Sequence, residues 1–497
     1  MSGRIKEEDV TYLRERVPID EVVADYVQLK SAGGGQKKGL CPFHDEKSPS
    51  FHVTPSKGFY HCFGCQASGD VISFLMKMDH LTFTETLERL ADRIGYTLRY
   101  EENSSGPSVP SGMRSRLIAA NAAAATYYQE QLNTSPDAAH GRDLLMKRGF
   151  DKDACKLFGV GFAPDDWDSL TKHLRAQGFT IDELETAGLS KMGQRGPIDR
   201  FRNRLTWPIK DITGDVVGFG CRKLASDEED QGPKYLNTPE TPIYKKSQVL
   251  YGLDVAKKEI AKKRQAVIVE GYTDVMAAHL AGITTAVATC GTAFGADHIR
   301  ILRRLLMDDD AFRGEVIFTF DGDAAGQKAA LRAFSDDQKF VTQTFVAVEP
   351  DGLDPCDLRQ NKGDAALRDL IARRVPLFEF AIRADLAKYN LSTPEGRIGA
   401  LNAAAPLVAQ IRDKSLRPEY SRSLAGWLGV EVEQVSGAVA TAMKKVPQVS
   451  VESTAPEVAA QEWRTEPQEQ GVILEREVLK ARWKATAVTT DFNYIES

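Results

Sequence analysis

The sequence lacks the features that would place the protein in a membrane or outside the cell. No apolar run reaches membrane-spanning length, and the first ten residues, MSGRIKEEDV, are too charged for a secretory signal. The seven cysteines are an odd number, and four of them stand alone: Cys155, Cys221, Cys290 and Cys356. This pattern argues against a disulfide framework, and we expect a cytoplasmic, reducing environment with no membrane partner.

An excess of positive charge and an internal repeat are also missing. The chain has 64 Lys and Arg against 70 Asp and Glu, which gives a net charge of −6. A negative total argues mildly against a nucleic-acid ligand, but it is a poor guide where local patches differ in sign. The 497 residues, 42% of them hydrophobic and 27% charged, indicate a globular protein of two to four domains.

Soft metal ligands are concentrated near the N-terminus, in the stretch CPFHDEKSPSFHVTPSKGFYHCFGC. Two residues separate Cys41 from His44, and two separate Cys62 from Cys65, a spacing that can place four ligands around a tetrahedral zinc ion. The segment between the pairs predicts a hairpin, whose small core a bound metal would supplement. With all four positions filled, the site would be structural. The alternative is four unrelated residues, or two free thiol pairs.

Aromatic and basic side chains surround these ligands. They suit stacking on single-stranded bases, although most of the rings could instead form the hairpin's own small core. The residues are Lys47, Phe51, Lys57, Phe59, Tyr60 and Phe63.

The rest of the chain divides into helical, mixed and alternating segments. Residues 5–30 predict helices broken at Pro18, and two amphipathic helices follow between 70 and 95, with Thr82 as a cap and Gly95 as a stop. A Ser-, Gly- and Pro-rich linker covers 102–115, and short helices and strands mix from 116 to 260. Between 261 and 352, strands at 266–270, 284–289, 315–320 and 343–348 alternate with helices, which predicts a parallel sheet. A helical subdomain at 353–445 and a linker at 446–470 complete the pattern.

Acidic residues follow three of the four predicted parallel strands. Glu270 and Asp274 follow the first, Asp321 and Asp323 the third, and Asp354 with Asp357 the fourth. Because the carboxyl ends of parallel strands meet at one edge of a sheet, these side chains should converge there. Carboxylates so close together repel one another unless a hard cation such as Mg²⁺ or Mn²⁺ is bound. The alternative is that some of them, Asp274 above all, only cap helices.

Basic residues gather between the linker and the acidic strands. In RFRNRLTWPI the strand period predicts that Arg200, Arg202 and Arg204 share one face, as a ridge for a polyanion or a triphosphate. A solvated strand face is the alternative. The other members of the group are Arg148, Arg195, Arg222, Lys223, Lys234, Lys245 and Lys246.

Together these motifs resemble those of the bacterial DNA primases. The resemblance rests on CPFH, CFGC, RFRNRLTWPI, GFGCR, GPKYLNTPET, LYG, EGYTDV and DGDAAG, in this order as far as about residue 440. It implies an α/β multidomain protein with an N-terminal zinc ribbon, a mixed α+β subdomain, a Toprim parallel-sheet domain and a C-terminal helical bundle. The acidic motifs alone are the broader Toprim pattern, which topoisomerases and some nucleases share.

The resemblance also implies an activity and roles for individual residues. The activity is synthesis of short RNA primers from ribonucleoside triphosphates on single-stranded DNA. Zinc would be structural and Mg²⁺ or Mn²⁺ catalytic, and the replicative helicase and a single-stranded DNA-binding protein would be partners at the replication fork. Carried over residue by residue, the roles are zinc binding for Cys41, His44, Cys62 and Cys65; catalysis for Glu270, Asp321 and Asp323; metal binding for Glu270, Asp274, Asp321, Asp323 and Asp354; and template or nucleotide binding for Arg148, Arg222, Lys234, Asn237, and Lys245 or Lys246. The strand-period argument adds Arg200 and Arg202 to the residues expected to bind template or nucleotide.

Two features depart from the family pattern. Many relatives carry Asp-Pro-Asp where this chain has Asp354-Pro355-Cys356, and a thiolate is a poor magnesium ligand, so Asp357 could compensate. The family's helicase-binding domain would begin at 471–497 and be mostly missing.

Other functions remain open at this point. A Toprim topoisomerase would need a nucleophilic tyrosine in a strand-passage domain, which is not evident, and a nuclease would share the acidic pattern. A non-catalytic zinc-ribbon DNA-binding protein would keep the knuckle without the chemistry. A phosphatase reading of DGDAAG leaves the EGYTD strand without a role.

Overall fold

The computed structural model describes residues 5–79, 81–100, 112–226, 228, 230–307, 314–320, 343–411 and 414–445. The chain divides into units 1–443 and 444–497, and the described residues lie almost entirely in the first. The linker expected at 446–470, the segment 471–497 and the helix expected between the strands at 315–320 and 343–348 lie outside them. Of the linker expected at 102–115, residues 113–115 already belong to a helix. No helix in the described ranges is long and apolar enough to span a membrane.

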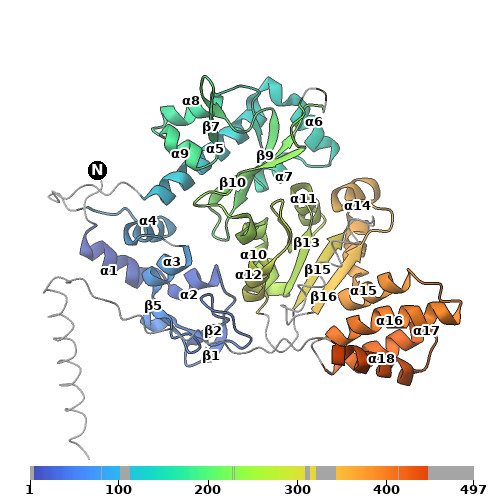
Figure 1. The fold of residues 1–497 in the computed structure, drawn as a ribbon. Coiled ribbons are helices and arrows are strands. Elements are labelled where there is room, and N and C mark those ends of the chain that lie inside the picture. The colour runs from blue at the N-terminus through green and yellow to red at the C-terminus, as the bar shows by residue number, and fades with distance from the viewer. Residues whose placement is uncertain are drawn as a thin grey trace, which may run out of the picture. The chain divides into compact units, whose positions relative to one another are not determined.

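The N-terminal part is a small antiparallel sheet packed against four helices (Figure 1). The helices break at Pro18, and Thr82 and Glu85 form a capping box, as the sequence indicates. The hairpin around the turn at 55–58 is also confirmed, with Phe51 opposite Cys62. The elements are α1 (Glu7–Arg16), α2 (Ile19–Ala24), β1 (Lys30–Gly33), β2 (Gln36–Gly39), β3 (Phe51–Thr54), β4 (Phe59–Cys62), β5 (Ser68–Asp70), α3 (Val71–Asp79) and α4 (Phe83–Arg93).

A mixed α+β subdomain follows, built on a four-stranded sheet in the order β11-β10-β9-β6. Its strands are short except for β9 and β10, and these two are almost entirely buried because helices cover them. The elements are α5 (Met113–Thr134), α6 (Ala139–Lys147), α7 (Lys152–Leu157), β6 (Gly161–Ala163), α8 (Ser169–Ala176), α9 (Ile181–Thr186), β7 (Ser190–Gly193), β8 (Gly196–Asp199), β9 (Arg204–Lys210), β10 (Val216–Lys223) and β11 (Tyr235–Asn237).

The parallel strands belong to a six-stranded sheet in the order β12-β14-β13-β15-β16-β17. The four strands expected from the sequence are parallel to one another, as predicted. The two edge strands, β12 and β17, pair antiparallel and were not predicted, because two-residue strands leave no periodicity to detect. The elements are β12 (Leu250–Tyr251), α10 (Leu253–Lys263), β13 (Gln265–Val269), α11 (Tyr272–Leu280), β14 (Ala286–Thr289), α12 (Ala296–Leu306), β15 (Glu315–Phe320), β16 (Gln343–Val348) and β17 (Val375–Pro376).

Helices make up the rest of the described chain, which confirms the expected α/β multidomain class. They are α14 (Pro355–Ala372), α15 (Leu377–Leu386), α16 (Pro394–Gln410), α17 (Leu416–Leu428) and α18 (Val432–Lys445). The last four enclose a separate small core of Ala, Leu, Ile and Val side chains (Figure 1).

One hydrophobic core joins the mixed subdomain to the six-stranded sheet. It runs from Leu132 to Ile371 in the sequence. At its centre Trp207 of β9 stacks on Tyr272 of α11, with ring centroids 5.8 Å apart, and its Nε1 lies 3.2 Å from the sulfur of Met276. Trp207 therefore packs against one face of α11 at the end of the helix that carries Asp274.

Candidate active site and metal centre

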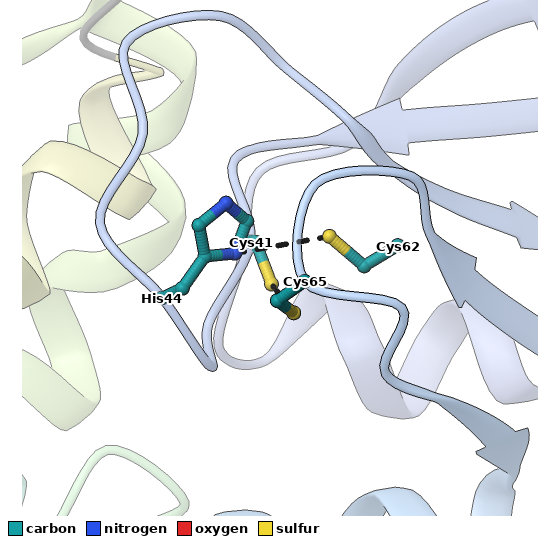
Figure 2. Close-up of side chains that lie close together, drawn as sticks. All are labelled: Cys41, His44, Cys62 and Cys65. Carbon is teal, nitrogen blue, oxygen red and sulfur yellow. Dashed lines mark hydrogen bonds between the residues drawn. The ribbon is translucent and has the colours of Figure 1, made fainter. Parts of the chain in front are cut away.

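The four predicted soft ligands come together at the N-terminal hairpin (Figure 2). One donor atom from each of Cys41, His44, Cys62 and Cys65 lies within 4.8 Å of the others. The sulfurs of Cys41 and Cys65 are 3.8 Å apart, as are the Cys62 sulfur and Nδ1 of His44. Three sulfurs and one imidazole at this spacing fit a structural, four-coordinate zinc ion.

The aromatic residues of the hairpin divide between the two interpretations. Phe51 and Tyr60 are fully buried, and their stacked rings form part of the domain core. Phe59 and Phe63 are 39% and 63% exposed and remain available for stacking on bases. The alternative of a small internal core is therefore correct for the first two rings only.

Two predicted acids follow strand β13, where the sheet meets helix α11. Glu270 is exposed. Asp274 is buried, and its carboxylate accepts hydrogen bonds from the amides of Gly271 (2.9 Å) and Cys356 (3.3 Å). The helix-cap interpretation of Asp274 thus holds, and the same side chain also ties α11 to the start of α14. Asp321 and Asp323 lie outside the described residues.

The acids after β16 are placed by the N-terminus of α14. Asp354 is the N-cap and accepts a 2.6 Å hydrogen bond from the amide of Asp357. Ligand atoms of Asp354, Cys356 and Asp357 lie within 4.8 Å of one another. Burial, together with the nearby Asp274 carboxylate, raises the pKa of the Cys356 thiol to about 12, although the charge of Arg148 opposes this rise. The thiol is therefore neutral near pH 7, which leaves carboxylate oxygens as the donors for a hard cation.

Sequence reasoning missed Glu349, a buried acid that shapes the loop before Asp354. Its carboxylate accepts hydrogen bonds from the amides of Asp351 (2.7 Å) and Leu353 (3.0 Å). The sequence shows only that an acidic residue follows a predicted strand by one position. This position is equally compatible with a structural role in the loop and with metal binding.

The predicted arginine ridge is wrong. Strand β9 begins only at Arg204, because Asn203 adopts a left-handed backbone with φ 48° and interrupts the extended run. Arg204 is buried against Asp230 (2.9 Å), and Arg202 instead lies over the exposed ring of Trp167, 3.7 Å from its centroid. Arg200 is half-buried, and burial lowers its pKa. The three guanidinium groups therefore do not share one face.

Two other predicted basic residues do approach the acidic edge. Arg148 lies 3.3 Å from the Cys356 sulfur and 3.9 Å from the Asp357 carboxylate. Burial raises the pKa of Tyr235 on β11, while the charges of Arg222 and Arg148 offset part of this rise. Arg148 therefore lies beside the start of α14, and Arg222 lies opposite Tyr235 in the pairing of β10 with β11. Lys234 and Lys245 are exposed, and Lys246 is half-buried.

Asn237 is held by protein contacts on both sides of its amide. Its oxygen accepts a 2.9 Å hydrogen bond from the Tyr272 hydroxyl, and its nitrogen donates one of 2.9 Å to the backbone oxygen of Cys290. Gly291 adopts φ 71°, and a Cβ atom there would lie 2.9 Å from the Asn237 nitrogen. Asn237 therefore connects β11 to the edge of the sheet where Glu270 lies.

Comparison with known proteins agrees with this arrangement. Over 430 residues the chain is 64% identical to the DNA primase of Streptomyces coelicolor, covering 86% of this chain and 66% of that protein. With the DNA primase of Mycobacterium tuberculosis it shares 58% over 440 residues, which cover 88% and 68%. The chain belongs to the bacterial DNA primase family. It spans about two thirds of the length of these two primases.

Family models for four parts of a primase match successive stretches of the chain. They are the CHC2 zinc finger (5–106), the N-terminal domain of the DNA primase catalytic core (127–257), the Toprim domain (264–347) and the DnaB-helicase binding domain of primase (378–433). The last lies upstream of 471–497, where we expected that domain to begin, and it covers α15 to α17. The Toprim match implies a divalent cation, and the carboxylates of Glu270 and Asp354 are donors suited to one.

A solved structure shares the fold of the central part. The RNA polymerase domain of Mycobacterium tuberculosis primase DnaG, solved with a double-stranded DNA oligomer that carries a 6-nucleotide overhang, is 61% identical. It superposes with a TM-score of 0.60 and covers 64% of this chain and 98% of that one.

Proposed function

We propose that the chain is a DNA-directed RNA polymerase that makes short RNA primers on single-stranded DNA. The observation that carries the proposal is the link between the Toprim acids: the Cys356 amide joins α14, which begins at Asp354, to the carboxylate of Asp274 beside Glu270. Family membership supports the same activity. We place it in the cytoplasm at the replication fork, with the helicase and a single-stranded DNA-binding protein as partners.

The acids and the basic residues have different tasks in this proposal. A 3′-hydroxyl attacks the α-phosphate of an incoming ribonucleoside triphosphate, and pyrophosphate leaves. Mg²⁺ or Mn²⁺ bound by the acids would neutralise phosphate charge and lower the pKa of the attacking hydroxyl. Glu270, Asp321 and Asp323 carry the catalytic role, while Asp274 and Asp354 complete the acidic cluster.

The basic side chains orient the template and the triphosphate. Arg148 and Arg222 suit the triphosphate because they approach the acidic edge. Arg202, stacked on the exposed Trp167, suits a template base or its phosphate. Lys234, Lys245 and Lys246 extend the positive surface.

The test is incubation with single-stranded DNA, labelled ribonucleotides and Mg²⁺, followed by separation of short products. The parent chain should make short RNA, and Asp321→Asn should lose synthesis while keeping DNA affinity. An Asp321→Asn chain that retains full activity would contradict the catalytic role of this acid. A covalent tyrosyl–DNA adduct would favour a topoisomerase, and DNA binding without any product in the parent would favour a non-catalytic binding protein.

A further inference from the structure

Glu46 lies beside the four predicted zinc ligands, but it belongs to neither of the two ligand pairs, Cys41/His44 and Cys62/Cys65. Its carboxylate is 10% exposed. One oxygen, Oε1, accepts hydrogen bonds from the amides of Cys41 (2.7 Å) and Ser50 (3.1 Å). The other, Oε2, accepts the hydroxyl of Ser50 and lies 3.3 Å from Nε2 of His44.

The two nitrogens of the His44 ring therefore face different groups. Nδ1 lies 3.8 Å from the Cys62 sulfur, on the side of the soft ligands, as Figure 2 shows. Nε2 faces the Glu46 carboxylate. A metal-bound imidazole usually donates its second N–H to a carboxylate or carbonyl, which fixes the tautomer and raises the basicity of the bound nitrogen.

The contacts of Glu46 reach three of the four ligands. It holds the Cys41 amide directly, it faces the His44 ring, and through Ser50, whose hydroxyl is 3.3 Å from the Cys62 sulfur, it reaches the second ligand pair. Gly64 closes the same space, since a Cβ atom there would lie 2.6 Å from Nε2 of His44 and 2.9 Å from the Ser50 hydroxyl. A glycine at position 64 therefore leaves room for the His44 ring and the Ser50 hydroxyl beside the Glu46 carboxylate.

We propose that Glu46 is the positioning residue of the zinc centre: its carboxylate accepts a hydrogen bond from the Nε2–H of His44, which selects Nδ1 as the zinc ligand, and its other contacts hold the two ligand pairs in place. A role limited to shaping the 45–50 turn would need only the amide contacts of Cys41 and Ser50. The orientation of the imidazole separates the two roles.

The first test compares zinc affinity in the whole chain, measured by competition with a chromophoric chelator. Removal of a carboxylate that supports a metal-bound histidine weakens metal binding by about 10- to 100-fold, and we expect this loss for Glu46→Ala. Glu46→Gln should fall between the parent and Glu46→Ala, because its amide oxygen can still accept hydrogen bonds. The matched control is Glu15→Ala, an exposed glutamate on α1, which should bind zinc as the parent does.

The second test needs no variant and therefore stands even if Glu46→Ala fails to fold. Histidine-selective ¹⁵N labelling of the zinc-loaded parent should show His44 protonated at Nε2, with Nδ1 bound to the metal. The opposite tautomer would overturn the proposal, as would a Glu46→Ala chain with the zinc affinity of the Glu15→Ala control. Both readouts are independent of primer synthesis, so their failure is distinguishable from failure of the proposed polymerase activity.

Discussion

Asn237→Ala tests whether this residue supports the sheet or contacts the nucleotide. The substitution removes two hydrogen bonds, one from the Tyr272 hydroxyl and one to the Cys290 carbonyl, both at 2.9 Å. Tyr272 is only 6% exposed, so water cannot easily replace the lost partner. An ordinary hydrogen bond contributes about 1 kcal/mol and a buried group left unpaired costs about 1–3 kcal/mol, so we expect a loss of about 2 kcal/mol in unfolding free energy.

The assay is urea unfolding of the parent, Asn237→Ala, Tyr272→Phe and the double variant. Because both single changes break the same hydrogen bond, the double variant should cost about 1 kcal/mol less than the sum. Lys234→Ala is the matched control: its side chain is exposed just before β11, so its unfolding free energy should stay within about 0.5 kcal/mol of the parent. If Asn237→Ala unfolds like the parent while its KM for ribonucleotides rises, the structural role is wrong and direct nucleotide contact is correct.

Three further predictions concern single charged residues. Asp274→Asn should reduce primer synthesis by about 10-fold or more and leave the affinity for single-stranded DNA unchanged. The reason is that the substitution weakens both the acidic cluster and the hydrogen bond from the Cys356 amide that connects α11 to α14. Synthesis equal to that of the parent at all Mg²⁺ concentrations would contradict this. Hydrogen bonds from Arg99 hold the pKa of the buried Asp9 at about 2, below its unfolded value. Ionised Asp9 therefore contributes its full stabilisation above about pH 4 and loses it as the pH falls toward 2. In acid unfolding followed by circular dichroism, the unfolding free energy of Asp9→Asn should depend less on pH in this range than that of the parent. Arg204→Ala should cost about 1–2 kcal/mol in unfolding free energy, since it removes the hydrogen bonds of a buried guanidinium to Asp230 and to the Pro233 carbonyl. Arg202→Ala should instead lower the affinity for single-stranded DNA at unchanged stability, and the reverse outcome would restore the ridge.

The sequence predicted features whose cause is local or periodic. The paired spacing of soft ligands located the metal centre. Two Cys/His pairs, each with two residues between its members, are typical of a zinc site. Alternation of apolar strands and helices located the parallel sheet, and Thr82 with Glu85 marked the start of α4. Each of these signals is carried by the spacing or pattern of residues within a single motif, strand or helix.

Features that depend on distant partners were not predictable in the same way. The strand period placed Arg200, Arg202 and Arg204 on one face, but a single left-handed residue, Asn203, ended the extended run. The family resemblance assigned Asn237 to template or nucleotide binding, whereas its hydrogen bonds to Tyr272 and Cys290, which are 35 and 53 residues away, could not be predicted from the sequence.

The shared core around Trp207 bears on how this protein can be divided. The family models separate the mixed subdomain from the Toprim domain between residues 257 and 264, yet apolar side chains from both sides of that boundary fill one interior. At Gly220 of β10 there is not even space for a methyl group, since a Cβ atom would lie 2.1 Å from the Tyr272 ring. A fragment cut at the boundary would expose that interior to water, so we expect the two domains to fold as a single unit although separate family models match them.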